Sequence, residues 1–157
     1  MANYLTYISH IPMKHVLIVS QQAEQDIAQI GHSSDREITA IKPTLLETIV
    51  TTIAHAKPDI VIIFDSTEEG NKNKLCQFLV NRYPKLKIAI VLRDSTMVTY
   101  QLLAESGFTV KGYITPPQYS QLSKAIDVIC SGETWLPREI EAKLVQYSQN
   151  QYIKALP

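Results

Sequence analysis

Acidic side chains gather at one point of the chain, directly after an apolar run. Asp65 follows residues 60–64, and Glu68 and Glu69 come shortly afterwards. Carboxylates in such a group are the oxygen ligands that Mg²⁺ takes in proteins. A loop pair of acids is more often a solvated charge patch, however, and an aspartate after a strand is more often a turn or capping residue. We therefore assign neither a metal site nor a catalytic residue from this group alone.

The thiols and imidazoles are too dispersed to form a site. Cys76 and Cys130 lie on separate predicted helices without a CxxC pair, which predicts two buried, reduced thiols. The four histidines show no metal-ligand spacing. They are His10, His15, His32 and His55. Since a Gly-rich phosphate loop and a nucleophile–base set are also missing from the sequence, we predict no enzyme and no cofactor.

Alternating apolar runs and helical patterns predict the elements that position these residues. Five short apolar runs predict strands at residues 14–19, 37–41, 60–64, 88–92 and 112–114. The central runs do not alternate with polar residues, which is typical of parallel strands covered on both faces. Apolar residues at helical spacing follow each strand, and the fourth helix would carry Val98, Leu102 and Leu103. Because right-handed crossovers cover such a sheet, we predict a flavodoxin-like doubly wound α/β domain.

The segment after the fifth predicted helix indicates one further helix. Trp135-Leu136-Pro137-Arg138 precedes another apolar helical pattern, and Pro137 suits the first turn of a helix. The length of 157 residues fits one domain. We divide the chain into an N-terminal extension at 1–13, the α/β domain at 14–131, the extra helix and the start of a linker at 132–148, and a polar tail at 149–157.

Charge and hydropathy restrict the classes of partner. Lysine and arginine number 15 and equal aspartate and glutamate, so the net charge is not the basic footprint of a nucleic-acid-binding domain. The sequence has no apolar window near the roughly 20 residues that span a bilayer. Residues 1–13 contain too short an apolar stretch for a signal peptide. We expect a cytoplasmic protein in which this domain contacts neither membrane nor nucleic acid.

These motifs resemble the receiver domain of LuxR-type (NarL/FixJ) response regulators over residues 14–147. Residues 58–63 are similar to the third strand of that family, 82–88 to the entry of the fourth strand, and the Gly112-Tyr113 pair to the start of the fifth. The most specific match is residues 132–140, which resemble the segment between receiver and effector linker. The resemblance implies a CheY-like fold and a signalling role. Family members continue into a helix-turn-helix DNA-binding domain, so we expect either a piece of a longer regulator or a stand-alone receiver.

The residues that carry phosphoryl transfer in this family are replaced here. The family uses an acidic pair after strand one for Mg²⁺, an aspartate ending strand three, a hydroxyl ending strand four and a lysine ending strand five. The matching positions hold, in that order, Ser20 with Gln21, Phe64, Leu92 and Pro116. Asp65 lies one residue beyond the acceptor position and is the remaining phosphoacceptor candidate, but strand alternation turns it away unless the strand bulges. We predict neither bound metal nor phosphorylation. The family's lysine–proline pair also implies a cis peptide bond between Pro116 and Pro117.

Two functions fit the resemblance. The first is a phosphorylation-independent receiver that acts by protein contacts, with a sensor kinase among its candidate partners, and forms a homodimer through its fourth helix, fifth strand and fifth helix. A dimer would place linked or separate DNA-binding domains on two half-sites. The second is a sensor of cyclic di-GMP. Residues 135–138 are similar to the Trp-aliphatic-Ser/Thr-Arg motif of biofilm regulators, with Pro137 in place of the hydroxyl and with Trp135 and Arg138 as ligand-binding candidates. In ordinary family members the same tryptophan anchors the last helix.

Overall fold

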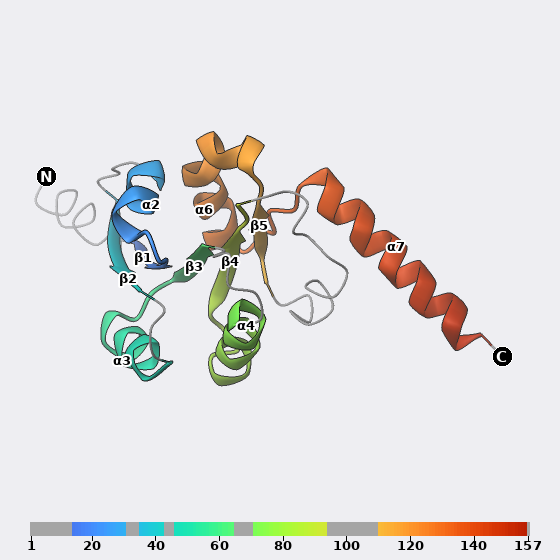
Figure 1. Ribbon diagram of the computed structural model, residues 1–157, viewed down its shortest axis with the longest axis horizontal. Helices are drawn as coiled ribbons and strands as arrows, with labels where there is room; N and C mark the ends of the chain where they lie inside the picture. Colours follow the sequence, from blue (N-terminus) through green and yellow to red (C-terminus); the bar gives the residue numbers. More distant parts are fainter. Residues whose placement is uncertain (1–13, 31–34, 43–45, 65–70, 94–109, 157) are drawn as a thin grey trace, which may run out of the picture.

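A five-stranded parallel sheet forms the centre of the computed structural model, which describes residues 14–30, 35–42, 46–64, 71–93 and 110–156. The strand order is β2-β1-β3-β4-β5, and every neighbouring pair is parallel (Figure 1). The strands are β1 (Lys14–Val19), β2 (Arg36–Ile41), β3 (Ile60–Phe64), β4 (Lys87–Val91) and β5 (Gly112–Ile114). This arrangement confirms the predicted flavodoxin-like doubly wound fold.

Helices cover both faces of the sheet (Figure 1). The helices of the described ranges are α2 (Ala23–Ile30), α3 (Leu46–Ala56), α4 (Asn71–Arg82), the 3₁₀ helix η2 (Pro116–Gln121), α6 (Leu122–Cys130) and α7 (Arg138–Ala155). Helices α2 and α6 pack on one face, and α3 and α4 pack on the other. The helix predicted around Val98, Leu102 and Leu103 lies outside the described residues.

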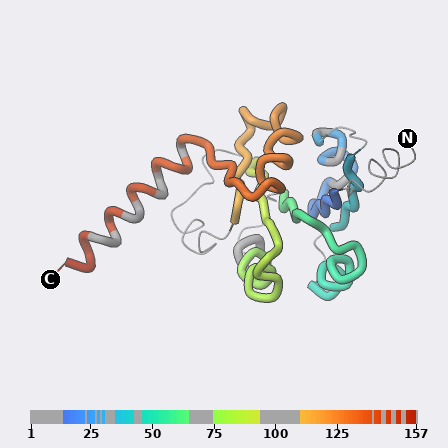
Figure 2. Tube along the Cα trace, turned by 180° about the vertical axis from the view of Figure 1, so that it is seen from behind, coloured from blue at the N-terminus to red at the C-terminus, as the bar shows by residue number. Residues whose placement is uncertain are grey.

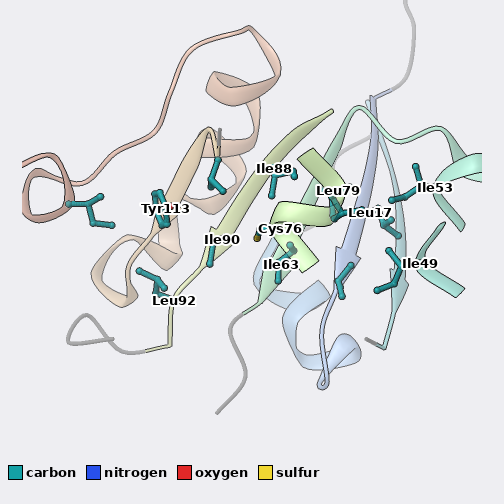
Figure 3. Packing of buried hydrophobic residues seen from close by; sticks show 14 residues of the cluster. Leu17, Ile49, Ile53, Ile63, Cys76, Leu79, Ile88, Ile90, Leu92 and Tyr113 are labelled. Atoms are coloured by element: carbon teal, nitrogen blue, oxygen red, sulfur yellow. The ribbon is translucent and has the colours of Figure 1, made fainter. Parts of the chain in front are cut away.

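Alternate residues of each strand enter opposite layers of the core, as the pleat of a β-strand requires. In β1, Leu17 packs with α3 and α4, whereas Ile18 packs with α2 and α6. Figure 3 shows the first of these layers, in which Cys76 and Leu79 of α4 lie close to strand residues such as Ile63. Both layers are almost fully buried, so the uninterrupted apolar runs reflect a sheet covered on two sides.

The edge strand β5 pairs with a segment that follows α6. Gly112 forms a parallel bridge with Trp135. The backbone N–H of Tyr113 donates to the Trp135 carbonyl at 2.9 Å, and the Trp135 N–H donates to the Lys111 carbonyl at 2.9 Å. A side chain at Gly112 would overlap the δ-methyl of Ile129, so glycine allows α6 to approach the strand closely. The segment thus covers backbone groups that an edge strand otherwise exposes.

Helix α7 is longer than the sequence predicts. It begins at Arg138, buries Ile140 against the core, and extends away from the sheet to Ala155 (Figures 1 and 2). The tail expected from residue 149 is therefore helical as far as Ala155, although the α7 side chains Val145 and Ile153 are exposed. None of the helices in the described ranges is long and apolar enough to cross a membrane.

Candidate functional site

The carboxyl ends of the parallel strands meet at one edge of the sheet, where doubly wound folds bind ligands. Ser20 follows β1, Phe64 ends β3, and Leu92 and Arg93 follow β4. Thr115 follows β5 and precedes η2. The predicted site positions at Ser20, Phe64 and Leu92 are thereby brought to a common edge, and Asp65 lies outside the described residues.

Ser20 is fully buried and holds the start of α2 in place. Its hydroxyl donates to the carboxylate of Asp26, a residue that is 3% exposed. The same hydroxyl oxygen accepts the backbone N–H of Gln22 at 3.0 Å, while the Ser20 N–H donates to the Ile41 carbonyl at 3.0 Å. Gln21, at the second acidic-pair position, is exposed in the turn. The two positions that follow β1 thus present a hydroxyl and an amide, and neither is a carboxylate.

An ion pair between a half-buried arginine and a buried aspartate occupies the edge beside Ser20. Nη2 of Arg93 lies 3.4 Å from Oδ2 of Asp26, and Nη1 lies 3.4 Å from the amide oxygen of Gln22. The Asp26 side chain is 4% exposed and the Arg93 side chain 33% exposed. A carboxylate at that depth needs a partner charge or several hydrogen bonds. Arg93 supplies the partner charge, and Ser20 and Arg93 each donate a hydrogen bond to the Asp26 carboxylate.

Phe64 and Leu92 point into the core. Phe64 packs in the layer with α2 and α6, and Leu92 packs in the layer with α3 and α4. The Leu92 backbone is also fixed, since its N–H donates to the Ile114 carbonyl at 2.8 Å and its carbonyl accepts the Tyr119 hydroxyl. Neither position presents a carboxylate or hydroxyl toward the edge.

The turn after β5 differs from the prediction. The described part of the chain contains no cis peptide bond, so the cis bond expected between Pro116 and Pro117 is wrong. Thr115 is extended (φ −93°, ψ 160°), and the two prolines begin η2. Because the fixed φ of proline suits the first positions of a helix, the chain turns by starting η2.

Gln118 connects this turn to Trp135. The indole Nε1–H of Trp135 donates to Oε1 of Gln118 at 3.2 Å, and the Thr115 hydroxyl donates to the same oxygen at 3.5 Å. Trp135 also packs against the layer with α2 and α6. Pro137 is buried, whereas Arg138 is exposed at the start of α7. The tryptophan therefore anchors the entry to the last helix.

The remaining candidates do not converge on this edge. Cys76 is fully buried, but Cys130 is only half buried, so the prediction of two buried thiols holds for one of them. Burial raises the pKa of the Cys130 thiol, and the nearby Lys14 and Lys87 charges oppose that shift. The described ranges hold no group of three or more metal-ligating His, Cys, Asp or Glu side chains. His10, His32, Glu68 and Glu69 lie outside those ranges.

Sequence reasoning missed the pairing of Asp26 with Arg93. Each residue is polar beside an apolar element, and 67 positions separate them. The available signal was an arginine directly after the apolar run 88–92, at an edge where functional side chains gather. Its partner could be identified only once β1 and β4 had been placed in the sheet.

The fold agrees with those of solved receiver domains. No family model and no curated protein matches this chain. The isolated receiver domain of RcsB from Salmonella enterica serovar Typhimurium, in its apo form, has a TM-score of 0.67 at 11% identity, covering 83% of this chain and 98% of that chain. A LuxR-family two-component response regulator from Aurantimonas sp. SI85-9A1 has a TM-score of 0.67 at 16% identity, covering 85% and 96%. The non-phosphorylated RcsB receiver domain from Escherichia coli gives 0.62 at 12% identity, covering 80% and 99%. The chain has the receiver fold.

Proposed function

We propose that this chain is the receiver module of a LuxR-type regulator, acting in signal transduction by protein contacts and independently of phosphorylation. The likeness in fold to receiver domains supports the signalling role. The observation that carries the phosphorylation-independent part is the Asp26–Arg93 pair beside Ser20. It occupies the edge where phosphoryl chemistry would need an open carboxylate pair and a metal ion.

Electrostatics at this edge argue against metal-assisted transfer. Mg²⁺ needs oxygen ligands that remain free to coordinate, but the buried Asp26 carboxylate already accepts from Ser20 and faces Arg93. A guanidinium is always charged, so it repels a second cation at the same carboxylate. Arg93 therefore acts as a fixed positive charge, and in our proposal the module keeps one conformation whether or not a phosphodonor is present.

Dimerisation would couple such a module to an effector. We place the dimer surface at the helix predicted around Val98, Leu102 and Leu103, together with β5 and α6. We place the module in the cytoplasm, with a linked or separate DNA-binding domain as its output. RcsB is known in complex with DNA. Helix α7 leads away from the sheet, which suits a connection to a further domain (Figure 2).

Sedimentation of the purified chain tests this proposal. The mass in solution should correspond to the same oligomer with and without Mg²⁺ and acetyl phosphate. A receiver with the intact acidic pair, acceptor aspartate and lysine serves as a control for donor activity. A change of oligomeric state in this chain on adding the donor would contradict independence from phosphorylation.

Cyclic di-GMP sensing is the second candidate, and the exposure of Arg138 favours it. Arg138 lies at the N-terminus of α7, where the helix dipole and free N–H groups favour phosphate. If the chain senses cyclic di-GMP through Arg138, the nucleotide increases the mass in solution. Arg138→Ala then abolishes the increase, whereas Arg93→Ala does not. An unchanged mass at saturating cyclic di-GMP would leave Trp135 with its packing role alone.

A further inference from the structure

A groove opens at the amino ends of the strands, on the edge of the sheet opposite to the candidate functional site. Its volume is about 1070 Å³. The last turns of α3 and α4, the start of β1 and the loop that enters β4 form its walls. A strand of five or six residues is roughly 16–20 Å long. The groove is therefore well separated from Asp26 and Arg93.

The lining of this groove is strongly basic. Five lysine and arginine side chains line it, namely Lys14, Lys57, Arg82, Lys85 and Lys87. Asp59 is the single carboxylate in the described lining, and its Oδ2 accepts the His15 backbone N–H at 2.8 Å. The whole chain carries 15 basic and 15 acidic side chains, so the groove concentrates a third of the cations with almost none of the acids.

Some of this positive charge already has a partner. Nζ of Lys87 donates to the Cys130 carbonyl at 2.7 Å, and Nζ of Lys14 lies 3.5 Å from Asp127. Three helices end at the groove, each contributing roughly half a negative charge. These ends, Asp59 and the Asp127 partner of Lys14 together carry about three and a half negative charges, against five cations. The surplus is positive, and no carboxylate in the described ranges lies at ion-pair distance from Lys57, Arg82 or Lys85.

An apolar and aromatic surface lies beside these cations. Ile53, Pro84 and Leu86 line the groove together with Tyr83. The Arg82 guanidinium carbon is 5.8 Å from the centroid of the Tyr83 ring. The tyrosine ring and the planar guanidinium together are suited to contact the aromatic ring of a ligand. The groove thus combines a surface for an aromatic ring with free cations for anionic oxygens.

We propose that this groove binds a nucleoside polyphosphate. Lys57 and Lys85 hold the phosphates, and the base packs against Tyr83 and Arg82. The assignment rests on charge, shape and aromatic lining at the amino edge, so it is independent of the function proposed for the carboxyl edge. It adds a small-molecule input to a fold whose ligands ordinarily bind at the other edge.

Nuclear magnetic resonance titration of the full chain with ATP, in the absence of Mg²⁺, tests the site. Saturable amide shifts should centre on Lys57, Tyr83 and Leu86 and spare Ser20 and Leu92. The double variant Lys57→Gln/Lys85→Gln should weaken binding at least about tenfold, because it removes both charge-assisted contacts to the phosphates. Lys57→Arg/Lys85→Arg should retain binding, and the matched control Lys42→Gln/Lys124→Gln, with both lysines exposed outside the groove, should leave it unchanged.

Two further probes separate the phosphate and base contributions. Pyrophosphate should bind the same residues more weakly than ATP, and Tyr83→Leu should weaken ATP without affecting pyrophosphate. Absence of saturable shifts at millimolar ATP would overturn the proposal, as would undiminished binding by the Lys57→Gln/Lys85→Gln variant. Shifts centred on Trp135 and Arg138 would also overturn it. Equal affinities for pyrophosphate and ATP would contradict the nucleotide assignment.

Discussion

The guanidinium of Arg93 lies 3.4 Å from the carboxylate of Asp26, and the pair joins the end of β4 to α2. Strand β3 lies between β1 and β4 in the sheet, so this ion pair spans the edge at which β3 ends. That edge is where a receiver of the resembled family would hold its metal ion and phosphoryl group. In this chain an internal cation and anion neutralise each other there. The arrangement gives the edge a structural role, and it makes the pair the first target for mutagenesis.

Removal of Arg93 should destabilise the fold. In Arg93→Ala the Asp26 carboxylate remains buried without its partner charge, and we expect the free energy of unfolding to fall by about 1–3 kcal/mol. Urea denaturation measures the change. The second substitution Asp26→Asn, made in the Arg93→Ala background, should restore part of the loss because it removes the uncompensated charge. The exposed Arg138→Ala is the control and should change stability by less than about 0.5 kcal/mol.

Gly112 should resist substitution because of its contact with α6. An added methyl group in Gly112→Ala would overlap the δ-methyl of the buried Ile129. We expect a loss of about 1–3 kcal/mol in the free energy of unfolding, typical of overpacking. Ile129→Val removes the overlapping methyl, so it should cost less in the Gly112→Ala background than in the unmodified chain. Equal costs in both backgrounds would contradict the close approach.

The two cysteines should differ from an ordinary thiol in their reactivity. Burial raises the pKa of Cys130, so less of its thiol is ionised at neutral pH and alkylation by iodoacetamide should be slow. The rate should rise as the pH increases through the raised pKa. Lys87→Gln removes a charge that lowers this pKa and should slow the reaction further. Peptide mass mapping follows each site, and the urea-unfolded chain provides the reference. Cys76, which is fully buried, should react only after unfolding. Modification of native Cys130 at the unfolded rate would contradict the burial effect.

The sequence predicted the sheet well because its signal is local. Runs such as Ile60–Phe64 are apolar throughout, and their ends position Ser20, Phe64 and Leu92 at one edge. The pairing of Asp26 with Arg93 depends on the strand order, which no local pattern specifies. The bridge between Gly112 and Trp135 is likewise a tertiary contact.

Two local predictions were wrong for physical reasons that a single sequence does not display. The cis bond at Pro116 was inferred from a lysine–proline pair, whereas two successive prolines begin a 3₁₀ helix instead. The predicted end of the last helix depended on apolar periodicity, which fades after Val145. Helix α7 nevertheless continues to Ala155, since its polar residues are compatible with an exposed helix.

Magnesium should leave thermal stability unchanged. A ligand present at 100 times its dissociation constant would stabilise the folded state by about 2.7 kcal/mol, which is readily visible as a higher melting midpoint. Because Arg93 faces the buried carboxylate, we expect the same midpoint in millimolar MgCl₂ and in NaCl of equal ionic strength. A rise specific to Mg²⁺ would show that oxygen ligands are available at this edge or elsewhere in the chain.

We propose that this chain, which has the receiver fold, is not phosphorylated. Intact-mass spectrometry after incubation with Mg²⁺ and acetyl phosphate tests it most directly, with a receiver that retains the acidic pair and acceptor aspartate as the positive control. We predict that this chain keeps its unmodified mass throughout the period in which the control is phosphorylated, because the family resemblance implies that Ser20, Gln21, Phe64 and Pro116 stand in place of the required groups. A stoichiometric phosphoryl adduct that maps to Asp65 would contradict the account.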